Sequence, residues 1–120
     1  LFCQDAGQWA LFGHGALMIV EKVTGDVVGQ VGINHGPHFP EKELGWMLYE
    51  AAEGKGYAFE AAECMRRWAY EVLSIKGLVS YIDPENTRSI ALAERLGAVQ
   101  DAQAARYDPQ DVVYRHRRAG

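Results

Sequence analysis

Apolar runs with the two-residue period of strands dominate the first third of the chain. Ala16 to Lys22 and Val27 to Ile33 are rich in β-branched and other apolar residues, and a Val-Thr-Gly-Asp tetrapeptide separates them. A turn of this composition between two strand-like runs predicts an antiparallel hairpin. The preceding segment, Asp5 to Phe12, has no clear period, and we expect it to be the tail of a helix or a structured loop.

A third strand-like run follows a break in the chain. Gly36, Pro37 and Pro40 predict a loop from His35 to Lys42. The alternation of side chains then predicts a strand with a buried face made of Leu44, Trp46 and Leu48, and an opposite face made of Glu43, Gly45, Met47 and Tyr49.

Two later segments have the period of helices that pack on a sheet. Apolar residues recur every three or four positions from Gly56 to Val72, which predicts an amphipathic helix. A second helix is predicted from Thr87 to Leu96, with Gly97 just beyond its end. Further strands are predicted at 77–82 and 112–116, the last with a partner within 99–107. Strands before and between two helices indicate an α+β, or mixed α/β, fold.

Composition narrows the class of protein. The chain has 120 residues, 48% of them hydrophobic, which suits a single domain with one modest core. A net charge of -4 argues against a nucleic-acid-binding surface. The longest apolar run near the start is too short to cross a membrane. Two cysteines far apart, Cys3 and Cys64, fit a reducing compartment better than a disulfide scaffold, so we expect a cytoplasmic protein.

The link between the third strand and the first helix is a candidate anion site. Gly54, Lys55 and Gly56 open the helix, so the backbone N–H groups of residues 54–58 are able to converge on one anion such as a pyrophosphate. A Rossmann turn would need a third glycine at Phe59, and a Walker loop would need Ser or Thr after the lysine. His35, His38 and Glu41 lack the spacing of a metal site, so no metal is predicted.

Three motifs stand out, namely Glu-Leu-Gly-Trp at 43–46, Gly-Lys-Gly-Tyr-Ala-Phe-Glu-Ala at 54–61, and the block at 83–98 with its Asn-x-x-Ser. Together they resemble the GCN5-related N-acetyltransferase (GNAT) superfamily, in particular its ribosomal-protein-alanine acetyltransferase branch. Both glycines of the family's acetyl-CoA signature match, although Ala51 stands where Gln or Arg is usual. The resemblance covers Trp9 to Arg117. The family normally begins with a strand and one or two helices before the hairpin, and this chain has little room for them.

The resemblance implies a mostly antiparallel, twisted sheet in which two parallel strands, 43–49 and 77–82, splay apart around acetyl-CoA. One backbone N–H, that of Leu48, would polarise the thioester carbonyl. No metal takes part. The residues implied to bind acetyl-CoA are Met47, Leu48, Tyr49, Gly54, Lys55, Gly56, Tyr57, Ala58, Asn86 and Ser89.

The implied chemistry is direct attack of an amine on the thioester. Glu43 is the candidate general base, or the anchor of a proton-relaying water; the alternative is a solvent-facing carboxylate. Many members donate the last proton from a tyrosine at the position of Ala93, which alanine cannot do. Ser89 is therefore the candidate acid, with Asn86 holding the pantetheine arm; the alternative is that Asn86 only caps the helix. Residues flanking the acceptor side are Trp9, His14, Asn34 and His38.

Two functions from different classes remain open at this stage. The first is an N-acetyltransferase acting on a primary amine, either a protein N-terminus or a small molecule. The alternative is an impaired acyl-CoA-binding module that acts as a sensor or partner. A homodimer is expected in either case, because an uncovered sheet edge tends to find a partner.

Overall fold

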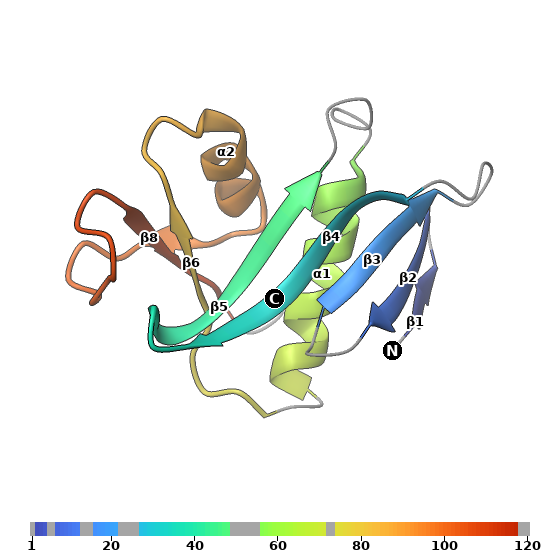
Figure 1. The fold of residues 1–120 in the computed structure, drawn as a ribbon, viewed down its shortest axis with the longest axis horizontal. Helices are drawn as coiled ribbons and strands as arrows, with labels where there is room; N and C mark the ends of the chain where they lie inside the picture. Colours follow the sequence, from blue (N-terminus) through green and yellow to red (C-terminus); the bar gives the residue numbers. More distant parts are fainter. Residues whose placement is uncertain are drawn as a thin grey trace.

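A computed structural model of the chain describes residues 2–4, 7–12, 16–21, 27–48, 56–71 and 74–117. Within these ranges one sheet carries two helices (Figure 1). The elements, in chain order, are β1 (Phe2–Gln4), β2 (Gly7–Phe12), β3 (Ala16–Glu21), β4 (Val27–Gly36), β5 (Phe39–Leu48), α1 (Tyr57–Glu71), β6 (Val79–Ile82), α2 (Thr87–Arg95), β7 (Val99–Gln100) and β8 (Val112–Arg115).

The sheet has the order β1-β2-β3-β4-β5-β6-β8-β7. Each neighbouring pair of these strands is antiparallel except β5 and β6, which are parallel. This arrangement confirms the predicted α+β fold with a single parallel pair. The predicted hairpin is also confirmed, because β3 and β4 pair antiparallel.

Two sequence-based expectations about the strands are wrong. Gly7–Phe12 forms β2, not a helix tail or loop, because its backbone pairs along its whole length with β3. The expected loop from His35 to Lys42 is a tight turn within a long hairpin. Gly36 has a φ of 134°, a value that L side chains rarely adopt, and only Pro37 and His38 lie between the two strands. The prolines therefore mark a turn and a strand start rather than a long break.

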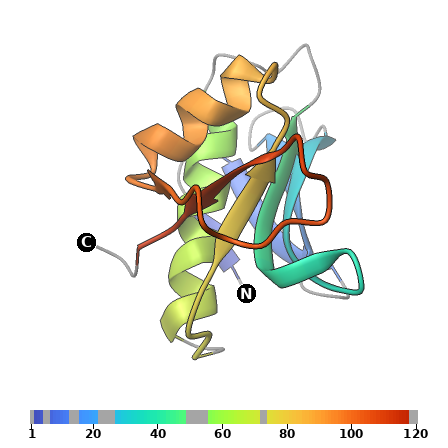
Figure 2. The same cartoon turned by 90° about the vertical axis from the view of Figure 1, so that its left-hand side faces the viewer.

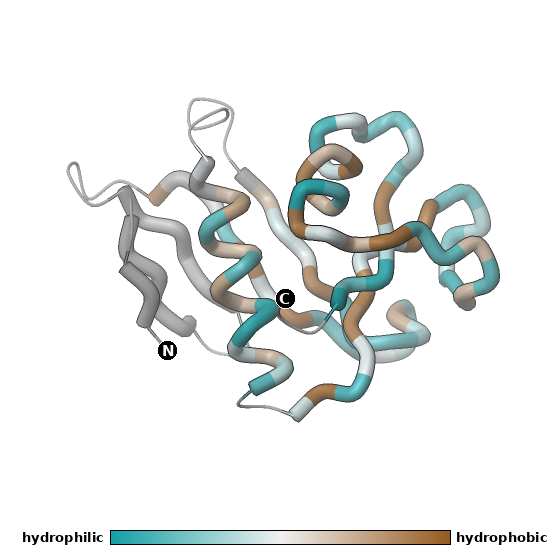
Figure 3. Tube along the Cα trace, turned by 180° about the vertical axis from the view of Figure 1, so that it is seen from behind, coloured by the Kyte–Doolittle hydropathy of each residue, from teal (hydrophilic) through white to brown (hydrophobic). Residues whose placement is uncertain are grey.

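The core lies between the sheet and α1. Ala61, Ala62, Met65 and Ala69 have no exposed surface, and they pack with Leu44 of β5, which is also fully buried. The opposite side of α1 is hydrophilic, as the mixed colours along this helix show (Figure 3). The period of three and four that predicted this helix therefore gives its buried face correctly.

Helix α2 lies on the same side of the sheet as α1 (Figure 2). Arg66 of α1 is buried and donates a hydrogen bond to the carbonyl of Leu96, at the C-terminus of α2. A cation at this position stabilises the negative end of the helix dipole. This contact joins the two helices beside the parallel strands.

Cys64 lies on the buried side of α1 and is disulfide-bonded. The expectation of unpaired cysteines is therefore wrong for this residue. The side chain of Cys3 lies outside the described part of the chain.

Candidate active site

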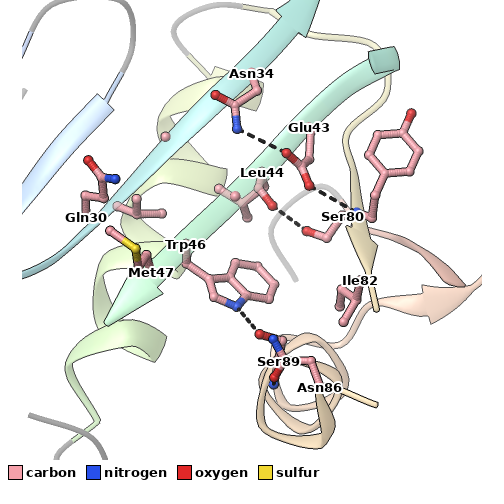
Figure 4. A pocket seen from close by; sticks show the side chains of 14 residues that line it. Gln30, Asn34, Glu43, Leu44, Trp46, Met47, Ser80, Ile82, Asn86 and Ser89 are labelled. Carbon is pink, nitrogen blue, oxygen red and sulfur yellow. Dashed lines mark hydrogen bonds between the residues drawn. The ribbon is translucent and has the colours of Figure 1, made fainter. Parts of the chain in front are cut away.

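The two parallel strands separate after a single pairing. β5 and β6 are in register only at Glu43 and Val79, whereas β6 and β8 pair over four residues. Beyond this point a cavity of about 360 Å³ opens between the strands. It is lined by Gln30, Val31, Gly32, Asn34, Glu43, Leu44, Gly45, Trp46, Met47, Ser80, Tyr81, Ile82, Asn86 and Ser89 (Figure 4). The splayed strand pair implied by the motifs is thus present.

Both carboxylate oxygens of Glu43 accept a hydrogen bond inside this cavity. The Asn34 Nδ2 donates to Oε1 at 3.0 Å, and the Tyr81 backbone N–H donates to Oε2 at 3.2 Å. Burial raises the pKa of Glu43, and these two hydrogen bonds oppose that rise without cancelling it. The carboxylate is therefore held in one orientation and takes up a proton more readily than an exposed glutamate does.

The start of α2 brings two polar side chains to the same cavity. Asn86 is the N-cap of α2, and its Oδ1 accepts a hydrogen bond from the Ser89 backbone N–H at 3.2 Å. The Trp46 Nε1 donates to the Ser89 Oγ at 3.1 Å (Figure 4). Since this bond uses a lone pair of the hydroxyl, the hydroxyl hydrogen of Ser89 is left to donate into the cleft. The capping alternative for Asn86 is correct as far as its Oδ1 is concerned, and its amide nitrogen remains able to donate.

A second cavity of about 680 Å³ extends the first towards the start of α1. Four residues line both cavities, namely Trp46, Met47, Asn86 and Ser89. The second cavity is completed by Gly56, Ala58, Phe59, Arg88, Ala91, Leu92 and Arg95. The two cavities form one groove that runs from the N-terminus of α1 to Glu43, a shape that suits a long, thin ligand with an anionic end.

Gly56 gives the groove its open end. Its φ is 79°, in the left-handed region, and a Cβ built on it would have no atom within 4 Å. Glycine is required by the backbone conformation rather than by crowding inside the protein. The space beside Gly56 is therefore left for a ligand to approach the backbone.

The structure brings together most of the described residues that the sequence singled out. Glu43, Asn34, Met47, Asn86 and Ser89 line the first cavity, and Gly56 and Ala58 line the second. His38 lies in neither. It is in the turn between β4 and β5, where its ring lies 4.3 Å from that of Tyr107. Outside the described residues lie His14, Tyr49, Gly54 and Lys55, together with the side chains of Trp9, Leu48 and Tyr57.

Sequence reasoning missed three residues of the groove. Trp46 was expected only in the core, and it does pack against the core, but its indole N–H also holds Ser89. Gln30 lines the first cavity with Asn34, four residues further along β4, so the strand period could have placed both on one face. Ser80 had no such signal, because its role depends on where β6 lies next to β5.

Two kinds of feature are not found in the described ranges. No group of three or more His, Cys, Asp or Glu residues is placed there to hold a metal ion. None of the helices in the same ranges is long and apolar enough to cross a membrane. Ala93, at the position where many relatives carry a tyrosine, is a fully buried residue of α2, and its methyl group supplies no proton.

Comparison with known proteins places this geometry in a family. Residues 2–99 match the model of the acetyltransferase (GNAT) domain. An acetyltransferase from Agrobacterium tumefaciens str. C58 of known crystal structure is 59% identical, with a TM-score of 0.84, over 89% of this chain and 63% of its own. A structure from Vibrio cholerae, provisionally described as a ribosomal-protein-serine acetyltransferase, is 28% identical with a TM-score of 0.67, over 83% and 61% of the two chains.

An uncharacterised protein of Bacillus subtilis, YkkB, is 31% identical over 106 residues, which are 85% of this chain and 62% of YkkB. The chain thus spans about three fifths of the length of these relatives. The family match extends over most of the sequence and includes the strand, glycine and helix motifs that build the groove. The chain belongs to the GNAT family of acetyltransferase domains.

Proposed function

We propose that the protein transfers an acetyl group from acetyl-CoA directly to a primary amine. The observation that carries this proposal is the groove between β5 and β6, which has a half-buried, oriented carboxylate at one end and an open helix N-terminus at the other. Family membership supports acetyl transfer. Residues 1–120 would form one domain of this enzyme.

Acetyl-CoA would lie along the free edge of β5. The Leu44 carbonyl faces β6, because it accepts a hydrogen bond from Ser80 of that strand. Backbone groups alternate sides along a strand, so the N–H groups of Trp46 and Leu48 face the same cleft. This favours the Leu48 N–H as the donor that polarises the thioester carbonyl. Met47 would contribute its half-exposed side chain, which lines both cavities.

The pyrophosphate of CoA would bind at the start of α1. Gly56 has the backbone conformation of a tight turn into a helix, and the N–H groups at this end have no partner within the helix. Gly54, Lys55, Gly56, Tyr57 and Ala58 would supply them, while Tyr49 would pair with the pantetheine arm.

Glu43 would accept the proton of the attacking amine, directly or through one water. Its raised pKa brings its proton affinity closer to the range that general-base catalysis near neutral pH requires. Asn34 would hold the carboxylate and line the acceptor side. As the tetrahedral intermediate collapses, Ser89 would protonate the departing CoA sulfur and regain a proton through water from Glu43, which took one from the amine; Asn86 would bond the pantetheine arm.

The acceptor would be the amine of a protein N-terminus or of a small molecule. Trp9, His14 and His38 remain candidates for the outer acceptor side. Because the Vibrio cholerae structure is provisionally described as a ribosomal-protein-serine acetyltransferase, a protein N-terminus is the first acceptor to test. We also propose a homodimer, since β1 and β7 are the edge strands of the described sheet. A cytoplasmic location is proposed on family membership alone, because Cys64 is not a free thiol. A monomeric mass in light scattering would contradict the dimer.

The test combines binding with turnover. Isothermal calorimetry measures affinity for acetyl-CoA and CoA, and a thiol-release assay measures turnover on a panel of small amines and N-terminal peptides. The proposal expects binding of both nucleotides and thiol release that depends on one class of amine. Binding without release on any amine would instead indicate the acyl-CoA-binding module, and no binding would contradict both functions.

A further inference from the structure

Two backbone groups at the point where β5 and β6 separate are taken up by side chains. If the parallel ladder continued one step beyond Glu43 and Val79, the Leu44 carbonyl would accept the Tyr81 N–H. Instead the Tyr81 N–H donates to the Glu43 Oε2, and the Leu44 carbonyl accepts from the Ser80 Oγ (Figure 4). Each group that would close the sheet is thus satisfied in another way.

The direction of the Ser80 hydroxyl is determined by His116. A serine hydroxyl has one hydrogen, and here it points to the Leu44 carbonyl. The His116 Nε2, at 2.8 Å from the Ser80 Oγ, must therefore be the donor of the second bond. The imidazole is neutral and carries its hydrogen on Nε2. Burial, with a smaller contribution from the Arg66 charge, lowers the pKa of His116 to about 4, so the ring stays neutral at neutral pH.

Nothing else in the described structure uses the His116 ring as a polar group. Its Nδ1 is buried and has no hydrogen-bond partner. A buried acceptor without a partner is unfavourable, and such groups are uncommon in folded proteins. The single polar contact of the ring is the bond to Ser80, which suggests that this contact is what the residue is there to make.

The position of His116 is set from both sides. Its backbone N–H donates to the Leu78 carbonyl at 2.9 Å, and its carbonyl accepts from the Tyr70 hydroxyl of α1 at 2.9 Å. The edge of its ring meets Trp46 with 6.1 Å between ring centroids, and Trp46 in turn holds Ser89. The ring therefore cannot leave Ser80 without disturbing the core.

We propose that Ser80 and His116 are a positioning pair that keeps β5 and β6 apart at the reacting end of the groove. This inference rests on the proposed function, because it is acetyl-CoA that would need the open strand edge. The Ser80 hydroxyl takes the Leu44 carbonyl away from Tyr81, and His116 keeps the hydroxyl turned that way. Neither residue exchanges a proton with a substrate.

The test compares Ser80→Ala with Ser80→Thr, which retains the hydroxyl, and with Tyr114→Phe. The last variant removes a hydroxyl from β8, whose bond to Glu94 at 3.2 Å lies outside the groove, and so is a matched control for loss of one hydrogen bond. Crystal structures of the variants without ligand give the distance from the Leu44 oxygen to the Tyr81 nitrogen. Steady-state kinetics give separate KM values for acetyl-CoA and for the amine.

In Ser80→Ala we expect the Leu44 oxygen and the Tyr81 nitrogen to approach hydrogen-bonding distance, about 3 Å. The KM for acetyl-CoA should rise about tenfold, the effect expected for loss of about one hydrogen bond, and kcat should also fall because the Tyr81 N–H leaves Glu43. In Ser80→Thr, the distance from the Leu44 oxygen to the Tyr81 nitrogen and the KM for acetyl-CoA should equal those of the unaltered protein. Tyr114→Phe should lower the melting temperature without changing that distance or that KM.

An unchanged gap in Ser80→Ala would overturn the proposal, as would a closed gap with a normal KM for acetyl-CoA. If Ser80→Ala does not fold, His116→Gln provides the same comparison with the hydroxyl present but no longer oriented by the imidazole. If the unaltered protein neither binds nor uses acetyl-CoA, the proposed function fails, whereas the structures of the variants still decide whether Ser80 holds the strands apart.

Discussion

A single methyl group at Gly45 should disturb Glu43 without disturbing the fold. A Cβ added at this position would lie 2.9 Å from the Asn34 Nδ2 and 3.3 Å from the Glu43 Oε1. The closer atom is at the end of a side chain that is free to move towards solvent. In Gly45→Ala the Asn34 amide therefore has to move, and its 3.0 Å hydrogen bond to Glu43 is lost.

The size of the effect follows from that bond. A hydrogen bond to a charged group contributes about 1.5–3 kcal/mol, and the exposure of Asn34 favours the lower end. Since 1.36 kcal/mol corresponds to a factor of ten in rate, kcat/KM for the amine should fall about tenfold. Folding should not suffer, because replacing Gly by Ala at an ordinary φ also restricts the unfolded chain.

The pH dependence adds a second, independent signal. The Asn34 bond lowers the pKa of Glu43 against the larger effect of burial, so its loss raises that pKa further. Because the base must be deprotonated to act, the acidic limb of the kcat/KM profile should move to higher pH. The assay is thiol release from acetyl-CoA over a range of pH at constant ionic strength.

The controls separate this cause from others. Asn34→Ala removes the same bond without the methyl group, so it should shift the limb in the same direction, and the double variant should add little to either change. Gly77→Ala adds a methyl group that meets its neighbours at ordinary distances of 3.4 Å or more, away from the groove, and should behave as the unaltered protein. An acidic limb that stays in place in both Gly45→Ala and Asn34→Ala would refute the assigned role of Glu43.

Three further predictions concern the groove and its support. Glu43→Gln should lower kcat by about a hundredfold or more. It should also raise the melting temperature at pH 8, because a carboxyl whose pKa is raised in the folded state loses its stabilising contribution as pH increases. A lower melting temperature would contradict this. Gly56→Ala should weaken CoA binding in calorimetry, while Gly97→Ala, at a φ of 86° and outside both cavities, should carry the same backbone cost and bind normally. Because the pKa of His116 is lowered, the free energy of unfolding should fall by about 3 kcal/mol as pH falls from 6.5 to about 4. Urea unfolding measures this fall, which should be smaller in His116→Gln. An equal fall in the variant would assign it to other groups.

Periodicity and local turn chemistry predicted most of the elements. The apolar spacing of Gly56 to Val72 located α1 and its buried face, because a helix can bury only one side against a sheet. Gly97, with its positive φ, was correctly expected just beyond α2. The alternation in 43–49 put Leu44 inside and Met47 outside, as observed.

The failures came where pairing with a distant strand outweighs local preference. Gly7–Phe12 has a weak period of its own but pairs in full with β3. His35 to Lys42 contains two prolines, which suggested a loop, yet Gly36 allows the chain to reverse within two residues and both flanking segments join the sheet. Strand pairing is non-local, so a single-chain pattern reports it poorly.

The sequence by itself determined the family, the helix-opening glycines and the carboxylate at position 43, because each depends on residues that are close together in the chain. Only the tertiary structure decided what holds that carboxylate. Asn34 and the Tyr81 N–H reach Glu43 from two neighbouring strands, and Trp46 reaches Ser89 across 43 residues of sequence. The opening of β5 from β6 depends in the same way on Ser80 and His116, which meet only after the last strand is in place. Hydrogen bonds act over about 3 Å, and the distances along the chain carry no record of which groups the fold will bring that close.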